Sequence, residues 1–150
     1  MNTAQITEDL STTQSAKLLY TAKAHTTGGR EGGASVTSDG RLDLRLSPPS
    51  GPDNGTNPEQ LLAVGWSGCF LSAIKHIAAK MKVRLPADPS IDAEVDLWTG
   101  DDGYSLRARL NVTMPHLDRQ VAQSLLDGAE QTCPYSKATR GNINTEISLV

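Results

Sequence analysis

Apolar and polar residues alternate along much of this chain on both sides of a long apolar segment. Between Lys17 and Thr26, for example, Leu18 and Tyr20 fall on one side, as in a β-strand with one covered face. The turn signal Asp39-Gly40 and the Pro- and Gly-rich stretch Ser47–Gly55 separate alternating segments. The pattern predicts six strands, at Lys17–Thr26, Ala34–Ser38, Leu42–Leu46, Ile91–Leu97, Tyr104–Thr113 and Ile143–Leu149.

The apolar segment in the middle of the chain predicts a helix. Asn57 can cap its first free amides, Pro58 suits the first helical position, and Glu59 complements the positive end of the helix dipole. We expect the helix to run to about Lys82. The fifteen residues of Gln60–Ile74 carry no formal charge and are apolar on almost every face. They are too few, and too rich in Gly and Ser, for a membrane span, so a buried helix is expected.

A second, amphipathic helix is predicted over Asp118–Gln131. The expected order is therefore three strands, a helix, a hairpin, a helix and an edge-like strand, and its adjacent antiparallel strands place the chain in the α+β class. A helix that is apolar all round needs cover on every side, and only one other substantial helix is predicted. The simplest source of the missing cover is a second copy of the same helix in a homodimer.

Length and charge narrow the classes of function. The 150 residues suit one domain, which we expect over residues 17–150, after a polar tail at Met1–Ala16 that we expect to be flexible. The net charge of −3 comes from 17 acidic and 14 basic residues without a basic cluster, so nucleic acid and membranes are not expected partners. Met1–Ala16 contains no Lys, no Arg and no apolar run, which argues against a secretory signal and favours the reducing cytoplasm.

The two cysteines are the candidate chemical groups. Cys69 lies in an apolar run and Cys133 opens the tetrapeptide Cys-Pro-Tyr-Ser. Two cysteines exclude a disulfide framework and a four-cysteine zinc site. Burial alone favours inert thiols, because free Cys is among the most buried residue types. The alternative is a catalytic or redox-active pair of cysteines. Two observations favour it: the expected location is the reducing cytoplasm, and the small residues Gly65 and Gly68 near Cys69 leave access to the sulfur.

A thiol in an apolar site is a poor nucleophile unless a cation stabilises its thiolate. Cys69 is about eleven residues into the predicted helix, too far from the positive end of the dipole. Arg30, in a Gly-Gly-Arg turn at a strand end, is the best candidate cation, and the alternative is that Arg30 is a solvated loop residue. The three histidines are scattered without metal-ligand spacing, and no phosphate-binding glycine loop is present, so we expect no metal and no cofactor.

Five sequence blocks together form a recognisable pattern: Leu19–Ala22, Thr27–Arg30, Gly55–Leu61, Ser67–Phe70 and Cys133–Asn142. In these blocks the chain resembles the organic hydroperoxide resistance family of the OsmC-like superfamily. The resemblance implies an intertwined α+β homodimer with antiparallel sheets around central buried helices and two sites at the subunit interface.

The resemblance also implies an activity and a set of site residues. Family members are thiol peroxidases that reduce organic hydroperoxides to alcohols and are regenerated by a lipoyl dithiol on a partner protein. Cys69 is then the peroxidatic cysteine, Cys133 the resolving cysteine, and Arg30 with Glu59 the polar pair that activates the thiolate. Trp66 departs from the family, which usually has Tyr there, and this bears on the shape of the substrate pocket.

Two questions remain open at the level of the sequence. The same cysteine pair could serve a peroxidase that turns over, or a redox sensor whose disulfide changes a binding surface, and the chemistry favours the peroxidase. The second question is geometric, because Glu59 and Cys69 are ten residues apart, about 15 Å of helical rise. Either the helix breaks near Gly65–Gly68, or the partner subunit contributes part of the site.

Overall fold

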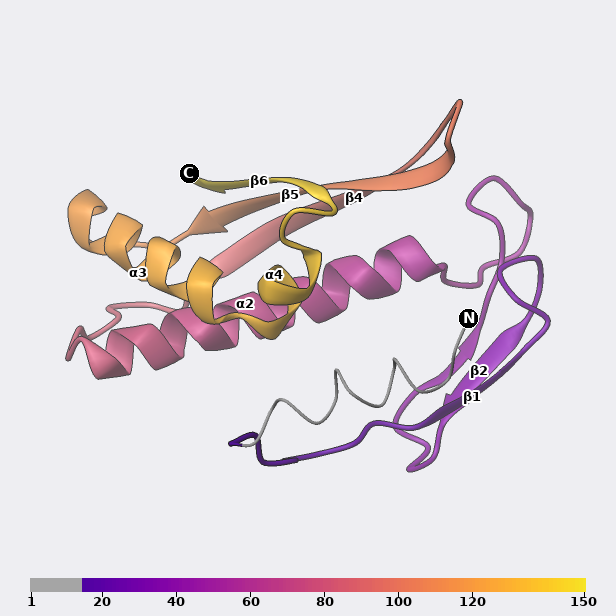
Figure 1. Ribbon diagram of the computed structural model, residues 1–150, viewed down its shortest axis with the longest axis horizontal. Coiled ribbons are helices and arrows are strands. Elements are labelled where there is room, and N and C mark those ends of the chain that lie inside the picture. The colour runs from indigo at the N-terminus through magenta and orange to yellow at the C-terminus, as the bar shows by residue number, and fades with distance from the viewer. Residues whose placement is uncertain (1–14) are drawn as a thin grey trace.

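The structure is a computed structural model that describes residues 15–150 (Figure 1). The predicted polar tail Met1–Ala16 therefore lies almost wholly outside the described residues. The elements are β1 (Ala24–Thr27), β2 (Ala34–Thr37), β3 (Asp43–Arg45), α2 (Pro58–Lys80), β4 (Ser90–Gly100), β5 (Gly103–Thr113), α3 (Arg119–Thr132), α4 (Pro134–Thr139) and β6 (Asn144–Leu149). The predicted α+β class is confirmed.

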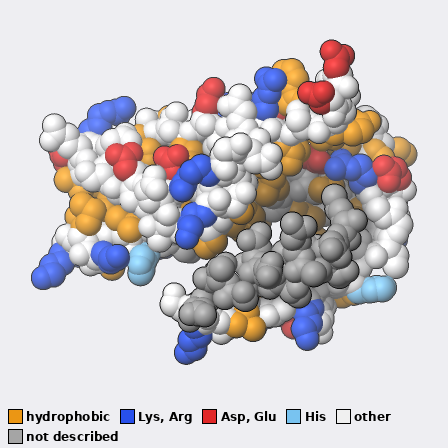
Figure 2. All heavy atoms as spheres, viewed as in Figure 1, with side chains coloured by type: hydrophobic (Ala, Val, Ile, Leu, Met, Phe, Trp, Pro, Cys, Tyr) orange, Lys and Arg blue, Asp and Glu red, His pale blue; other side chains and the backbone are white. Residues whose placement is uncertain are grey.

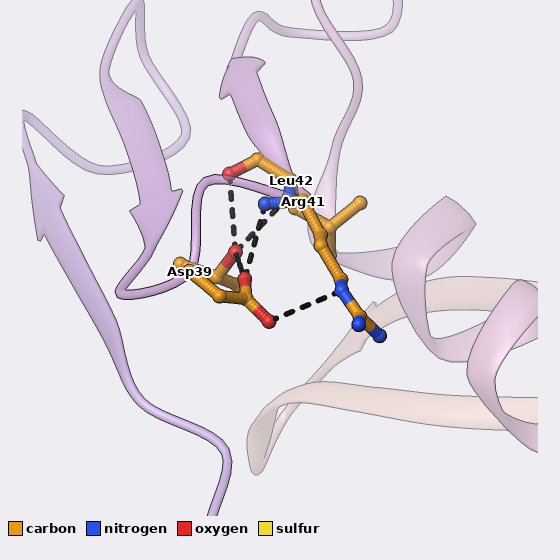
Figure 3. Close-up of polar contacts among 4 residues, drawn as sticks. Asp39, Arg41 and Leu42 are labelled. Atoms are coloured by element: carbon orange, nitrogen blue, oxygen red, sulfur yellow. Dashed lines mark hydrogen bonds and ion pairs between the residues drawn. The ribbon is translucent and has the colours of Figure 1, made fainter.

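The first three strands form a small antiparallel sheet, in the order β1-β2-β3, at the end of the molecule where α2 begins (Figure 1). The β2–β3 turn is built on Asp39, whose carboxylate accepts from Thr37 Oγ1 at 2.8 Å and from the Arg41 amide at 3.0 Å. On the other side of the turn, the Leu42 backbone N–H donates a hydrogen bond to Thr37 Oγ1 at 3.0 Å (Figure 3). The turn predicted at Asp39-Gly40 is thus confirmed.

The strand predicted over Lys17–Thr26 is wrong in its length, because only Ala24–Thr27 is a strand. A strand needs a partner, and β2 offers just four residues to pair with β1. Within residues 15–150 the preceding segment pairs with no strand of its own chain. Its apolar side chains Leu18, Leu19 and Tyr20 are 80%, 87% and 76% exposed.

Helix α2 begins as the sequence predicts and continues without interruption for 23 residues. Asn57 Oδ1 accepts from the Gln60 amide at 2.9 Å, and Pro58 occupies the first turn. The helix ends at Lys80, two residues before the predicted end, and Lys82 has a left-handed backbone with φ 55°. A helix break near Gly65–Gly68 is therefore excluded.

The second sheet has the order β4-β5-β6 and covers one side of α2 (Figure 1). Strands β4 and β5 form the predicted antiparallel hairpin; β4 is longer than predicted at both ends, and β5 begins one residue earlier than predicted. Strand β6 pairs parallel to β5, which is an exception to the antiparallel pairing that is expected and is found in the other strand pairs. The reason is the connection: α3 and α4 carry the chain back across the sheet, and β6 then runs in the same direction as β5.

The core lies between the second sheet, α2 and α3, and it leaves much of α2 uncovered. The buried residues of α2 number five of 23: Trp66, Phe70, Ala73, Ile74 and Ala78. By contrast Val64, in the same helix, is 71% exposed. Figure 2 shows apolar side chains at several places on the surface of the molecule.

Within the described residues, α2 is the one helix long and apolar enough to cross a membrane. Its buried residues belong to the core cluster that also includes residues of β5 and α3, which is the position of a core helix. The uncovered remainder of α2 is the face for which the sequence predicts a second copy of the chain.

Candidate active site

Arg30 projects from a tight turn between β1 and β2 that glycines make possible. Gly28 and Gly29 have φ of 74° and 66°, in the left-handed region that favours glycine. The Gly33 amide closes the turn by donating to the Gly29 carbonyl at 3.0 Å. A β-carbon on Gly33 would collide with the carbonyl oxygens of Thr27 and Gly29. The glycines therefore set the point from which the Arg30 side chain leaves the sheet.

The Arg30 guanidinium forms a two-pronged ion pair with Glu59 in the first turn of α2. Its Nη1 and Nη2 donate to Glu59 Oε2 and Oε1 at 3.2 and 2.9 Å. The carboxylate is 12% exposed and the guanidinium 36% exposed. The hydrogen bond and charge of Glu59 raise the pKa of Arg30, and the hydrogen bond from Arg30 lowers the pKa of Glu59. Both groups are therefore charged and fixed in orientation at neutral pH.

Two cavities border this ion pair. One, of about 240 Å³, lies beside Arg30 and Glu59 and has apolar walls from Leu97, Tyr104 and Leu106 at the tip of the β4–β5 hairpin. The other, of about 320 Å³, lies between the start of α2 and the β4 residues Ala93, Val95 and Leu97. Neither cavity is lined by a cysteine. Within one chain, the cation thus borders a largely apolar cavity that is not lined by a thiol.

The two cysteines are neighbours in the middle of the molecule. Cys69 lies on α2 and is half-buried, whereas Cys133 ends α3, precedes α4 and is fully buried. Burial raises the pKa of the Cys69 thiol, the backbone amide of Tyr135 lowers it, and the adjacent Cys133 thiol raises it. No cation in the described part of the chain contributes to this pKa. Within one chain, Cys69 is therefore a poorly activated thiol.

A short helix that the sequence pattern did not predict packs next to the cysteines. Helix α4 begins at Pro134. The Tyr135 hydroxyl lies so close to Gly65 that a β-carbon on this residue would be only 2.6 Å from it. The buried indole N–H of Trp66 donates to Ser136 Oγ at 3.1 Å. Pro134 directly after a capping position was the available sequence signal. Residues Tyr135 and Ser136 therefore join α4 to α2 beside Cys69.

Trp66 lines neither of the two cavities that border the Arg30–Glu59 ion pair. It lines a separate cavity of about 150 Å³ together with Ser136 and residues around the start of β6. The side chain is 1% exposed. Within one chain, the departure at Trp66 thus affects the contact between α2 and α4, whereas the shape of the cavities beside Glu59 does not depend on it.

The structure brings the candidate residues together as two separate pairs. Arg30 contacts Glu59, and Cys69 lies beside Cys133, but ten residues of the continuous helix α2 separate Glu59 from Cys69. This corresponds to about 15 Å of rise, beyond the reach of one Arg side chain that also holds Glu59. Among residues 15–150, no group of three or more His, Cys, Asp and Glu side chains could hold a metal ion.

Comparisons with known proteins identify the family. Residues 51–148 match the family model described as OsmC-like protein. The organic hydroperoxide resistance protein of Xanthomonas axonopodis pv. citri is 47% identical over 138 residues, which is 89% of this chain and 96% of that protein.

Solved structures agree. The crystal structure of the organic hydroperoxide resistance protein OhrB of Bacillus subtilis superposes with a TM-score of 0.83 at 38% identity, covering 89% of this chain and 100% of that one. An organic hydroperoxide resistance protein from Legionella pneumophila has the same TM-score at 40% identity, covering 89% and 98%. The chain therefore belongs to the organic hydroperoxide resistance family of the OsmC-like superfamily.

Proposed function

We propose that this protein is a cysteine-based peroxidase that reduces organic hydroperoxides to alcohols. The observation that carries the proposal is the complementarity of the two pairs. Cys69 with Cys133 is a thiol pair without a cation, and Arg30 with Glu59 is a fixed cation beside apolar cavities without a thiol. Each pair lacks what the other supplies for thiol chemistry on an apolar peroxide.

The working site is composite and is formed in a homodimer. Because α2 is straight, the cation next to Cys69 comes from Arg30 of the partner subunit, held by Glu59 of the partner subunit. The uncovered face of α2 around Val64 supports this arrangement, since a largely exposed apolar helix face is unfavourable in water. The exposed Leu18–Tyr20 segment and the projecting N-terminal sheet supply further apolar surface for an intertwined contact. Two identical sites follow from the two-fold symmetry.

The chemical step follows from these groups. The Cys69 thiolate attacks one oxygen of the hydroperoxide, the O–O bond breaks, and an alkoxide leaves as Cys69 becomes a sulfenic acid. The partner's guanidinium stabilises first the thiolate and then the developing alkoxide, which takes a proton to leave as the alcohol. Glu59 keeps the planar guanidinium in one orientation. The walls formed by Leu97, Tyr104 and Leu106 accept the organic part of the substrate.

Regeneration uses the second cysteine. The Cys133 thiol condenses with the Cys69 sulfenic acid, which forms a disulfide and releases water. A dithiol of the lipoyl type, carried by a partner protein, then reduces the disulfide by thiol–disulfide exchange. The resting state has two free thiols, which suits the reducing cytoplasm as the place of action.

Replacing the resolving cysteine should separate the two halves of this cycle. We expect Cys133→Ser and Cys133→Ala to consume one equivalent of hydroperoxide at close to the parent rate, because attack needs only Cys69. The sulfenic acid should then persist and be oxidised to the sulfinic form as hydroperoxide increases, while lipoyl-dependent turnover falls markedly. Mass spectrometry of the treated parent should find a Cys69–Cys133 disulfide within one chain. Disulfides only between chains, or none, would contradict the resolving role.

Catalytic consumption distinguishes the peroxidase from a redox sensor. Purified protein should consume many equivalents of cumene hydroperoxide in the presence of dihydrolipoamide, with alcohol formed in equal amount. A sensor would stop after one equivalent per Cys69 even with excess dithiol. Cumene hydroperoxide should also be a better substrate than hydrogen peroxide, because only the organic peroxide has an apolar group for the cavity walls. A protein that stops at one equivalent would overturn the proposed function.

A further inference from the structure

One buried hydrogen bond joins the helix that carries Cys69 to the short helix that follows Cys133. The Trp66 indole N–H donates to Ser136 Oγ over 3.1 Å, and the two residues are 1% and 4% exposed. Breaking this bond leaves polar atoms unpaired away from water, which costs more than breaking an exposed bond. The bond therefore favours one position of α4 on α2.

The bond lies about one turn from each thiol. Trp66 precedes Cys69 by three residues on α2, and Ser136 follows Cys133 by three residues. Helix α4 has only six residues and no side-chain cap at its start, so its own hydrogen bonds do little to fix it. Its contacts with α2 and α3 must supply the rest. Among the described residues, the Trp66–Ser136 bond is the one hydrogen bond between a side chain of α2 and a side chain of α4.

The position of Cys133 matters after the first step of the cycle, when two reactions compete for the Cys69 sulfenic acid. In the first, the Cys133 thiol displaces water and a disulfide forms. In the second, another organic hydroperoxide gives one oxygen to the sulfur, leaving a sulfinic acid and an alcohol. The first is intramolecular, so its rate depends on how closely the fold holds the two sulfurs in a reactive arrangement.

We propose that the Trp66–Ser136 hydrogen bond positions Cys133 for attack on oxidised Cys69 and so protects Cys69 from overoxidation. This inference rests on the proposed function and adds two positioning residues to it. Neither residue lines the cavities that border Arg30 and Glu59, so the bond acts on disulfide closure and not on attack at the peroxide. The indole N–H of Trp66 thus has a role beyond packing, because an apolar aromatic side chain could fill the same space without it.

Trp66→Phe and Ser136→Ala test the inference, since each removes one partner and keeps most of the volume. With cumene hydroperoxide as probe, stopped-flow measurements should give a parent-like rate for the first equivalent. Disulfide closure should slow by about three- to tenfold, the effect expected for one lost buried hydrogen bond. The fraction of sulfinic Cys69 at a fixed peroxide excess should rise by a similar factor. The double variant should be no slower than either single variant, because both remove the same bond.

Matched controls separate positioning from general destabilisation. Trp98→Phe alters a 44% exposed Trp that stacks with Arg107, and Ser67→Ala removes an α2 hydroxyl bonded to its own helix at 2.7 Å. Neither should change closure. Ser136→Thr keeps the hydroxyl and should restore most of the closure rate lost in Ser136→Ala. Thermal unfolding identifies any variant that does not fold. If Trp66→Phe does not fold, the test rests on Ser136→Ala and on the rescue of closure by Ser136→Thr.

The outcomes are distinct from a failure of the proposed function. Parent protein that forms the disulfide, together with variants that close as fast and overoxidise no more, would overturn the positioning role alone. Parent protein that forms no sulfenic acid on Cys69 would overturn the proposed function and this inference with it. Slow closure in both single variants, parent-like closure in both controls and rescue by Thr would support the inference.

Discussion

Cys69→Ser should lower the rate of organic hydroperoxide reduction by about three orders of magnitude or more, because it removes the nucleophile itself. A serine hydroxyl is almost fully protonated at neutral pH and cannot form a sulfenic acid. The change is small and the site is half-buried beside the Tyr135 amide, so the fold should survive. Consumption of cumene hydroperoxide with dihydrolipoamide, followed on protein of checked thermal stability, measures the effect.

Cys133→Ser is the matched control for this variant, because it also exchanges one sulfur for oxygen in the same pair. It should still consume the first equivalent, whereas Cys69→Ser should consume none. If Cys69→Ser retained more than about one per cent of the parent rate, the result would contradict Cys69 as the nucleophile, and the thiol pair would have to be interpreted as structural.

Arg30→Ala should lower kcat/KM for organic hydroperoxides by about 10²–10³-fold, the loss typical of removing one preorganised group that stabilises developing negative charge. Burial raises the Cys69 pKa within one chain, and in the proposed dimer the guanidinium of the partner subunit lowers it. Loss of that charge should therefore shift the pH dependence of Cys69 alkylation to higher pH, with less thiolate at neutral pH. Alkylation in the Cys133→Ala background keeps the readout to one thiol.

Two further arginine variants make the Arg30 result specific. Arg41→Ala removes an 89% exposed guanidinium from the same N-terminal sheet and should change neither kcat/KM nor the alkylation profile. Arg30→Lys keeps the charge but cannot hold Glu59 through two parallel hydrogen bonds, so its activity should be intermediate. An unchanged alkylation profile in Arg30→Ala would mean that another group activates Cys69.

Local features of the fold were predictable from the sequence, and features that depend on distant pairing were not. The start of α2 followed from Asn57 and Pro58, because capping is decided within one turn. The length of the first strand did not, because it depends on how much of β2 is available as a partner. The parallel direction of β6 could not be predicted either, since alternation reveals which side chains share a face but not which way the neighbour runs.

The candidate site shows the same division. The two cysteines and Arg30 were candidates from the residues themselves, whereas Glu59 and the role of each residue entered through the family resemblance. Arg30 and Glu59 are 29 positions apart and the two cysteines 64, and residues so far apart carry no periodic signal. Helix α4 was missed because six residues are too few for a helical period to appear. The contact of Trp66 with Ser136 spans 70 residues, so only the packing of α4 on α2 reveals it. The separation of Glu59 from Cys69 was different, because a straight helix fixes it from residue count alone.

The central claim is that each site combines Cys69 of one subunit with Arg30 of the other, and heterodimers test it. One subunit carries Arg30→Ala and the other Cys69→Ser, and two affinity tags isolate the mixed dimer. If the site is composite, one site has both defects and the other is intact. If each site lies within one chain, both sites are defective. The matched control is a dimer that joins an unaltered subunit to one with both substitutions. In that dimer both sites are defective if the site is composite, and one site is intact if each site lies within one chain.

The measurement is the rate of cumene hydroperoxide reduction by the purified mixed dimer, relative to the unaltered dimer. We expect about half of the unaltered rate when the two substitutions are on different subunits, and almost none when they are on the same subunit. Almost none in the first dimer and about half in the second would contradict the composite site, and would place Arg30 and Cys69 in a site within one chain.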